Sequence, residues 1–226
     1  MKAKPVCFIF GAGSPPSQPP SIAANDLVIA ADGGYTYLQN EGIRVDALIG
    51  DFDSLGNMPK HENTNLVVQR LEMEKDQTDM FAALQYGLER GYSSFHLFGG
   101  TGGRFDHTFA NIQCLAYLVN HGARGYLYEG CFVITAVAGE LWLSKQKDGI
   151  LSVFALGNAT EGVTLRGLKY ELEDARLSGD FPLGVSNEFI GQTAYIKAER
   201  GILLVVYPTG TKELEEAPIS KRQLPS

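Results

Sequence analysis

Short apolar segments alternate with helical patterns through the first half of the chain. The segments are PVCFIF (5–10), DLVIAAD (26–32), VDALIGD (45–51), NLVVQRL (65–71), FHLFGG (95–100) and GYLYEG (125–130). Strands that alternate with helices in this way are typical of a mainly parallel sheet. The pattern therefore predicts an α/β fold for this half.

Two segments between these strands have the period of an amphipathic helix. In TDMFAALQYGLERG (78–91) we expect one apolar stripe to face the sheet, made of Phe81, Leu84 and Leu88. In DHTFANIQCLAYLVNHG (106–122) the expected stripe is Phe109, Ile112, Ala116 and Val119. Gly91 and Gly122 follow these segments as helix C-cap signals.

After about residue 130 the helical period fades and short strand patterns follow one another. They are CFVITAV (131–137), GELWLSK (139–145), GILSVFAL (149–156), GVTLRGL (162–168), TAYIKAE (193–199) and GILLVVYP (201–208). Such spacing is typical of an antiparallel sandwich or barrel. We therefore expect an α/β domain at 1–130 and a β-rich domain at 131–226.

Composition narrows the class of protein. The chain of 226 residues is 44% hydrophobic, has a formal charge of −7 and contains no apolar run long enough to span a membrane, so we expect a soluble, cytoplasmic protein. The negative charge argues against a nucleic-acid partner, because phosphate backbones are bound by clusters of Lys and Arg. A small polyphosphate remains possible if a divalent cation screens it.

Three cysteines, Cys7, Cys114 and Cys131, are far apart and lack CxxC spacing. Neither a disulfide framework nor a zinc site is indicated, and we expect buried free thiols. His61, His96 and His121 have no mutual metal-ligand spacing. We interpret them as structural.

The residues that follow the predicted parallel strands are acidic and rich in glycine. Ligands of parallel α/β sheets bind outside the carboxyl ends of the strands, so these residues are the candidate site. The acidic ones are Asp32, Asp51, Asp53, Asp76, Asp79 and Asp106.

Asp51 and Asp53 stand two residues apart, which in an extended chain puts both carboxylates on one side. Mg²⁺ usually takes one or two carboxylates and completes its shell with waters and substrate phosphates, so this pair suits it. The alternative is an Asx-turn with Ser54 and a surface aspartate.

Asp76 and Asp79 lie where the helix of 78–91 begins. Either Asp76 or Thr78 could cap that helix. Capping explains one aspartate, and the second is interpreted as a partner of magnesium or of a substrate hydroxyl. Lys75 beside them is either a phosphate contact or a solvated lysine.

The segment LFGGTGGRFDHTFAN (97–111) runs from a strand through four glycines into a helix. Glycines let a ligand approach the backbone, and the start of a helix offers unpaired N–H groups to phosphate oxygens. Arg104 adds a planar fork suited to phosphate. The segment is neither a P-loop nor a dinucleotide fingerprint. The alternative is a tight turn in which Asp106 only caps a helix and His107 is structural.

In order along the chain, DGG (32–34), GDFDS (50–54), DQTD (76–79) and GGTGGRFDH (99–107) precede LRGLKYEL (165–172) and VSNEF (185–189). This set resembles the thiamine pyrophosphokinase family. The resemblance implies transfer of a pyrophosphoryl group from ATP to the hydroxyl of thiamine with Mg²⁺, giving thiamine diphosphate and AMP. It also implies an N-terminal α/β domain, a C-terminal β-sandwich, and a homodimer whose active sites lie between the domains and across the subunit interface.

The resemblance further implies roles for individual residues. The catalytic set is Asp51, Asp53, Asp79 and Arg104, with Asp51, Asp53 and Asp79 as the metal ligands. The nucleotide-side set is Asp32, Gly33, Gly100, Gly102, Arg104, Asp106 and His107. The thiamine-side set is Asp76, Tyr170, Ser186, Asn187 and Phe189, with Tyr170 or Phe189 as the ring that stacks on thiamine. Our hypothesis is that Asp79 or Asp53 orients or accepts the proton of the thiamine hydroxyl.

Other readings of the same acidic residues are a magnesium-dependent nucleotide hydrolase, a kinase of another small alcohol, and a binding module without turnover. Product identity separates the enzymes. Against a mere binding module stands the density of carboxylates, which repel polyphosphate unless a metal is present. A Toprim-like nucleic-acid enzyme fits poorly with the charge of −7.

Overall fold

The computed structural model describes residues 4–52, 66–71 and 77–214. The chain forms two compact units, Met1–Thr135 and Ala136–Ser226.

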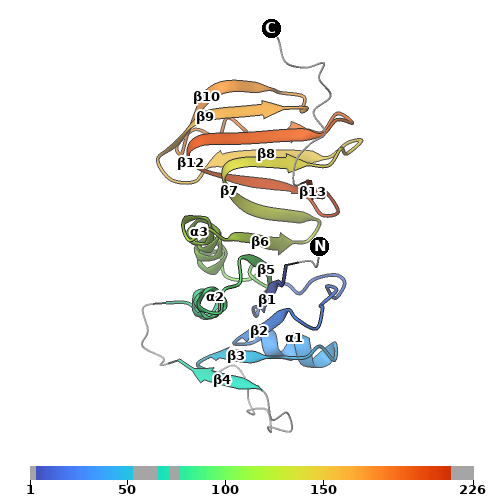
Figure 1. Ribbon diagram of the computed structural model, residues 1–226, viewed down its shortest axis with the longest axis vertical. Helices are drawn as coiled ribbons and strands as arrows, with labels where there is room; N and C mark the ends of the chain where they lie inside the picture. The colour runs from blue at the N-terminus through green and yellow to red at the C-terminus, as the bar shows by residue number, and fades with distance from the viewer. Residues whose placement is uncertain (1–3, 53–65, 72–76, 215–226) are drawn as a thin grey trace. The chain divides into compact units, whose positions relative to one another are not determined.

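The first unit is built on a parallel sheet (Figure 1). Its strands lie in the order β4-β3-β2-β1-β5-β6, and the first residues of β7 (Phe132–Leu143) pair antiparallel with β6. All six predicted strands are confirmed, namely β1 (Cys7–Phe10), β2 (Leu27–Ala31), β3 (Ala47–Gly50), β4 (Val67–Arg70), β5 (Ser94–Phe98) and β6 (Arg124–Glu129).

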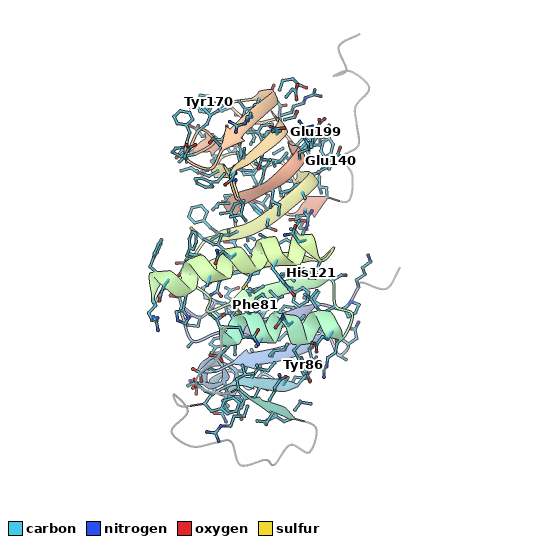
Figure 2. All side chains as sticks on the ribbon, turned by 90° about the vertical axis from the view of Figure 1, so that its left-hand side faces the viewer. Phe81, Tyr86, His121, Glu140, Tyr170 and Glu199 are labelled. Carbon is cyan, nitrogen blue, oxygen red and sulfur yellow. The ribbon has the colours of Figure 1, made fainter. Side chains whose placement is uncertain are left out.

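Helices cover both faces of this sheet. Helices α2 (Asp79–Glu89) and α3 (Phe105–Asn120) lie side by side on one face (Figure 2), and a Cβ at Gly87 of α2 would stand 2.6 Å from the Phe95 ring. On the other face Leu38 of α1 (Gly34–Asn40) packs with Phe8 and Phe10. In the described part of the chain, no helix combines the length and apolar character needed to cross a membrane.

The helical stripes differ from the predicted ones. In α3 the residues buried against the sheet are Asn111, Cys114, Leu115 and Leu118, whereas Phe109 is 53% exposed. In α2 Leu84 is buried as predicted, but Phe81 and Leu88 are only half-buried. The apolar residues of α3 are spread over most of the helix surface, so the helical period of the sequence did not single out one face. The polar Asn111, which has a tertiary partner, marks the face that is buried.

Aromatic rings line the α1 face of the sheet. Phe8, Tyr126 and Tyr128 surround His96, with ring centroids 5.0–5.5 Å away. The Tyr128 hydroxyl lies 2.8 Å from Nδ1 of His96. Burial lowers the pKa of His96 to about 4. The ring is therefore neutral at ordinary pH, in accord with the structural role predicted for it.

For the other histidines and the cysteines, the structure agrees with some of the predictions and contradicts one. His121 caps its own helix, with Nδ1 2.8 Å from the Tyr117 carbonyl oxygen, while His61 lies outside the described residues. Cys7 and Cys114 are buried free thiols as predicted, but Cys131 is exposed. The prediction for Cys131 was wrong because the residue occupies the turn between β6 and β7.

The second unit consists of antiparallel strands, which confirms the predicted fold class. It contains the remainder of β7 (Phe132–Leu143), then β8 (Ile150–Ala155), β9 (Ala159–Arg166), β10 (Leu172–Ser178), β11 (Asn187–Glu188), β12 (Ala194–Pro208) and β13 (Glu213–Leu214). The first half of β12 pairs with β9 and its second half with β8.

Two pairs of predicted strands are in fact single long strands. Segments 131–137 and 139–145 both fall in β7, and segments 193–199 and 201–208 both fall in β12. The second segment of each pair begins at a glycine, and Gly139 and Gly201 have φ of +89° and +94°. Glycine adopts such values within a strand, so it need not end one.

The strand order of the first unit reverses between β1 and β5, and the two segments that follow these strands are bound together. The Gly11 N–H donates to the Phe98 carbonyl, Gly13 to Gly99 and Ser14 to Thr101, each at 2.8 Å. Parallel pairing therefore continues beyond the strands into the glycine-rich loops.

Glycine is required for this pairing of loops. A Cβ at Gly13 would lie 2.0 Å from the Thr101 carbonyl oxygen, and one at Gly102 would lie 1.7 Å from Oγ of Ser14. A Cβ at Gly103 would meet nothing within 4 Å. Loop-to-loop contact thus constrains Gly13 and Gly102. For Gly102 this constraint adds to the ligand approach expected from the sequence.

We predict that Gly102→Ala destabilises the protein by roughly 1–3 kcal/mol, through overpacking and a backbone φ of +78° that disfavours alanine. Gly103→Ala, one residue away, should stay within about 0.5 kcal/mol of the parent. Urea denaturation followed by circular dichroism measures both. Equal stability of the two variants would contradict the loop contact.

Candidate functional site

A cavity of about 260 Å³ opens at the carboxyl edge of the parallel sheet. It lies at the switch point between β1 and β5, where open α/β sheets bind ligands. It is lined by two glycine-containing loops, the end of β2 and the starts of two helices: Gly11, Ala12, Gly13, Ala31, Asp32, Thr78, Asp79, Met80, Gly99, Gly100, Thr101, Gly103, Arg104, His107, Thr108 and Asn111.

Asp32 and Asp51 follow the neighbouring strands β2 and β3. The Asp32 N–H donates to the Ile49 carbonyl at 2.9 Å, and a Cβ at Gly50 would stand 3.2 Å from the Asp32 Cα. Asp32 has a φ of +46° and Phe52, beside Asp51, has +65°. Left-handed backbone costs energy for residues other than glycine, and such residues cluster at functional sites. The Phe52 side chain, 6% exposed, anchors this strand end in the core.

Asp79 lines the cavity from the first turn of α2. The N-cap of α2 is Thr78, whose Oγ1 accepts from the Phe81 N–H at 3.2 Å. The sequence offered Asp76 or Thr78 as the cap of this helix, and in the structure the cap is Thr78. Capping therefore does not account for Asp79. Asp53, Ser54, Lys75 and Asp76 lie outside the described residues.

Arg104 and Asp106 form an exposed pair at the start of α3. Nε and Nη2 of Arg104 donate to the two carboxylate oxygens at 3.2 and 2.6 Å. The hydrogen bond from Arg104 lowers the pKa of Asp106, and the same bond raises the pKa of the guanidinium. Asp106 therefore orients the guanidinium, and within the described residues no hydrogen bond engages Nη1.

The predicted nucleotide-side residues divide into two groups. Asp32, Gly100, Arg104 and His107 line the cavity. Three others do not line it, namely Gly33, Gly102 and Asp106. Each of these three is next to a lining residue in the sequence, so the structure brings the whole predicted set to one edge of the sheet.

Sequence reasoning missed Thr101 and Asn111. Asn111, 5% exposed, donates from Nδ2 to the Gly100 carbonyl at 2.7 Å and so holds the glycine loop. Thr101 is also 5% exposed, and its hydroxyl has no hydrogen-bond partner among the described residues. A buried hydroxyl without a partner costs free energy, so the cavity suits a ligand that accepts a hydrogen bond there. The sequence signal that could have indicated Asn111 is a polar asparagine within an otherwise apolar helical pattern.

The carboxylates at this edge fit a magnesium ion. No group of three or more His, Cys, Asp or Glu side chains that could hold a metal occurs among the residues described. Mg²⁺ does not need one, because one or two carboxylates suffice when waters and phosphates complete its shell. Asp32 and Asp79 supply carboxylates at the cavity itself.

Apart from Asp76, which belongs to the first unit, the predicted thiamine-side residues lie in the second unit. Tyr170 is 58% exposed in the loop between β9 and β10 (Figure 2), and Ser186 is exposed with a φ of +58°. Asn187 and Phe189 are each 3% exposed. Of the two rings considered for stacking, Tyr170 alone has a face that a ligand can reach.

Comparison with known proteins identifies both units. Residues 20–127 match the family model "Thiamin pyrophosphokinase, catalytic domain", and residues 142–203 match "Thiamin pyrophosphokinase, vitamin B1 binding domain". The thiamine pyrophosphokinase of Bacillus subtilis is 30% identical over 206 residues, covering 88% of this chain and 96% of that protein.

Solved structures agree. The crystal structure of the Bacillus subtilis thiamine pyrophosphokinase has a TM-score of 0.80 at 29% identity, covering 91% of this chain and 99% of that one. That of a thiamin pyrophosphokinase family protein from Enterococcus faecalis has a TM-score of 0.77 at 27% identity, with the same coverage of 91% and 99%. The chain belongs to the thiamine pyrophosphokinase family and is an enzyme that transfers a pyrophosphoryl group from ATP to thiamine, giving thiamine diphosphate and AMP.

Proposed function

We propose that the cavity between β1 and β5 is the ATP site of this pyrophosphokinase, and that it binds the nucleotide with Mg²⁺. The observation that carries the proposal is the convergence at one switch point of the paired glycine loops, the starts of α2 and α3, and Arg104. Helix starts and glycine loops offer N–H groups to phosphate oxygens, and Arg104 adds a permanent positive charge.

Charge balance supports magnesium. ATP is polyanionic, and the cavity carries Asp32 and Asp79 on its wall with Asp51 at the adjacent strand end. Without a cation these carboxylates would repel the phosphates. We assign Asp51 and Asp79 as magnesium ligands, together with Asp53 on the sequence evidence. Magnesium supplies charge neutralisation of the triphosphate in such sites.

The reaction requires attack at the β-phosphorus of ATP. The hydroxyl oxygen of thiamine forms the new P–O bond, the bond between the β-phosphorus and the α–β bridging oxygen breaks, and AMP leaves. Charge on the transferring group is spread over its oxygens, so positioning and charge neutralisation contribute most of the catalysis. Arg104, oriented by Asp106, can direct Nη1 to these oxygens.

The proton of the thiamine hydroxyl needs an acceptor. A carboxylate of the acidic group meets that need, and we assign Asp79 or Asp53. Asp79 has the stronger structural support because it lines the cavity while Thr78 caps the helix.

Thiamine binding is assigned to the second unit, through the ring of Tyr170 and the segment that contains Ser186. The cationic thiazolium of thiamine suits an exposed aromatic face, since a cation is attracted to the ring quadrupole. A homodimer with sites between domains and across subunits, and a cytoplasmic location, remain predictions from the sequence.

Asp79→Asn and Asp53→Asn should each lower kcat by at least about 100-fold, since both proton acceptance and metal binding need a charged carboxylate. Chromatography of AMP and thiamine diphosphate measures the rate, and EDTA should abolish it in the parent. Asp148→Asn, at an exposed position between β7 and β8, serves as the control. Full activity of both test variants would contradict the assignment.

Thr101→Val should raise the KM for ATP about 5- to 10-fold and leave the KM for thiamine unchanged, because it removes a hydroxyl that donates to the nucleotide. Its stability should equal or exceed that of the parent, since the variant buries no unpaired hydroxyl. Thr101→Ser should retain the parent KM. An unchanged KM for ATP in Thr101→Val would mean that the hydroxyl bonds only to water.

A further inference from the structure

Two segments of the second unit are tied together around Tyr170. One is the loop 167–171 between β9 and β10, and the other is the segment 186–189. Leu168 and Phe189 form an isolated antiparallel bridge. The Lys169 N–H donates to the Glu188 carbonyl at 3.0 Å, and Nζ of Lys169 lies 2.7 Å from Oε1 of Glu188.

Asn187 lies at the centre of this contact. Its Oδ1 accepts from the N–H groups of Tyr170 and Glu188, both at 2.9 Å. Its Nδ2 donates to the Tyr170 carbonyl at 2.7 Å. The side chain is 3% exposed. One amide therefore satisfies both backbone polar groups of Tyr170, as a neighbouring strand would.

These bonds leave little of the Asn187 side chain for a substrate. An asparagine amide accepts at most two hydrogen bonds and donates two. Both acceptor positions and one donor are used within the loops. The expectation that Asn187 itself borders thiamine therefore has less support than a role in holding Tyr170.

The backbone on both sides fixes this geometry. Ser186 has a φ of +58°, and its N–H donates to Oγ of Ser152 at 3.0 Å. Asn187 then pairs with Leu151 of β8. The chain turns at Ser186, and the side-chain amide of the next residue, Asn187, is buried against the Tyr170 backbone.

Tyr170 is the residue presented by this arrangement. With its N–H and C=O both bound, its backbone is fixed while its side chain stays 58% exposed. The ring keeps only its two χ angles as freedom. Fixing a contact residue before binding lowers the entropy cost of binding, so it improves affinity.

We propose that Asn187 is a positioning residue, which holds the backbone of Tyr170 so that the tyrosine ring is presented to thiamine. The inference rests on the assignment of Tyr170 to the thiamine site made above. It places the effect of Asn187 on thiamine affinity and not on the chemical step or on ATP.

A double-mutant cycle tests the proposal with the full-length enzyme, using Tyr170→Ala, Asn187→Ala and the double variant. Each single variant should raise the KM for thiamine about 10-fold, with kcat and the KM for ATP within about twofold of the parent. The KM for thiamine of the double variant should not exceed that of the single variant with the higher KM, because Asn187 acts through Tyr170. Amide hydrogen exchange at Tyr170 should become faster in Asn187→Ala.

Matched variants separate the positioning role from loop stability. Glu173→Gln breaks the exposed ion pair with Arg166, on the strands that flank the same loop, and should leave the KM for thiamine within about twofold of the parent. Asn187→Asp keeps the size of the side chain and loses the donor to the Tyr170 carbonyl. It should reproduce the raised KM, and it replaces Asn187→Ala in the cycle if the alanine variant fails to fold.

Three results would overturn the proposal. Additive effects in the double variant would mean that Asn187 contacts thiamine directly. A lower Tm and kcat with an unchanged KM for thiamine would mean that Asn187 only stabilises the fold. An unchanged KM for thiamine in Tyr170→Ala would instead remove Tyr170 from the thiamine site, and the proposed assignment would fail with it.

Discussion

The contact between two backbone segments after β1 and β5 is the constraint on which the candidate nucleotide site depends. Three hydrogen bonds join residues 11–14 to residues 98–101 and carry the pairing beyond the sheet. Because the carbonyl and N–H groups used in this contact face each other, the loops keep a fixed spacing. The cavity wall, the start of α3 and the position of Arg104 follow from that spacing.

The same edge of the sheet combines opposite electrostatic demands. Helix starts and Arg104 attract phosphate, whereas Asp32 and Asp79 repel it until a cation intervenes. A site of this kind is selective, because neither the polyanion alone nor the cation alone satisfies all of its charges. This agrees with a chain that is negative overall yet uses ATP.

Local pattern was sufficient to predict the parallel strands, the antiparallel second half and the edge of the sheet where the candidate site residues gather. Features that depend on tertiary partners were not predictable. In the sequence Asn111 is only a polar residue within an apolar helix, and its bond to the Gly100 carbonyl depends on the fold. In the same way, the sequence pattern around Asn187 indicates a turn and does not show its bond to Tyr170. Gly201 looked like the end of a strand because period and composition do not show a strand that continues through a positive φ.

The aromatic face of the first unit has a consequence for proton linkage. His96 has a pKa of about 4 in the folded chain against 6.5 for an unperturbed imidazole. Above pH 6.5 the ring is neutral whether folded or not, and it does not affect stability. As the pH falls from 6.5 to about 4, the unfolded chain takes up a proton that the folded chain refuses. This favours unfolding by on the order of 3 kcal/mol. A residue outside the candidate site thus contributes to the acid sensitivity of the first unit.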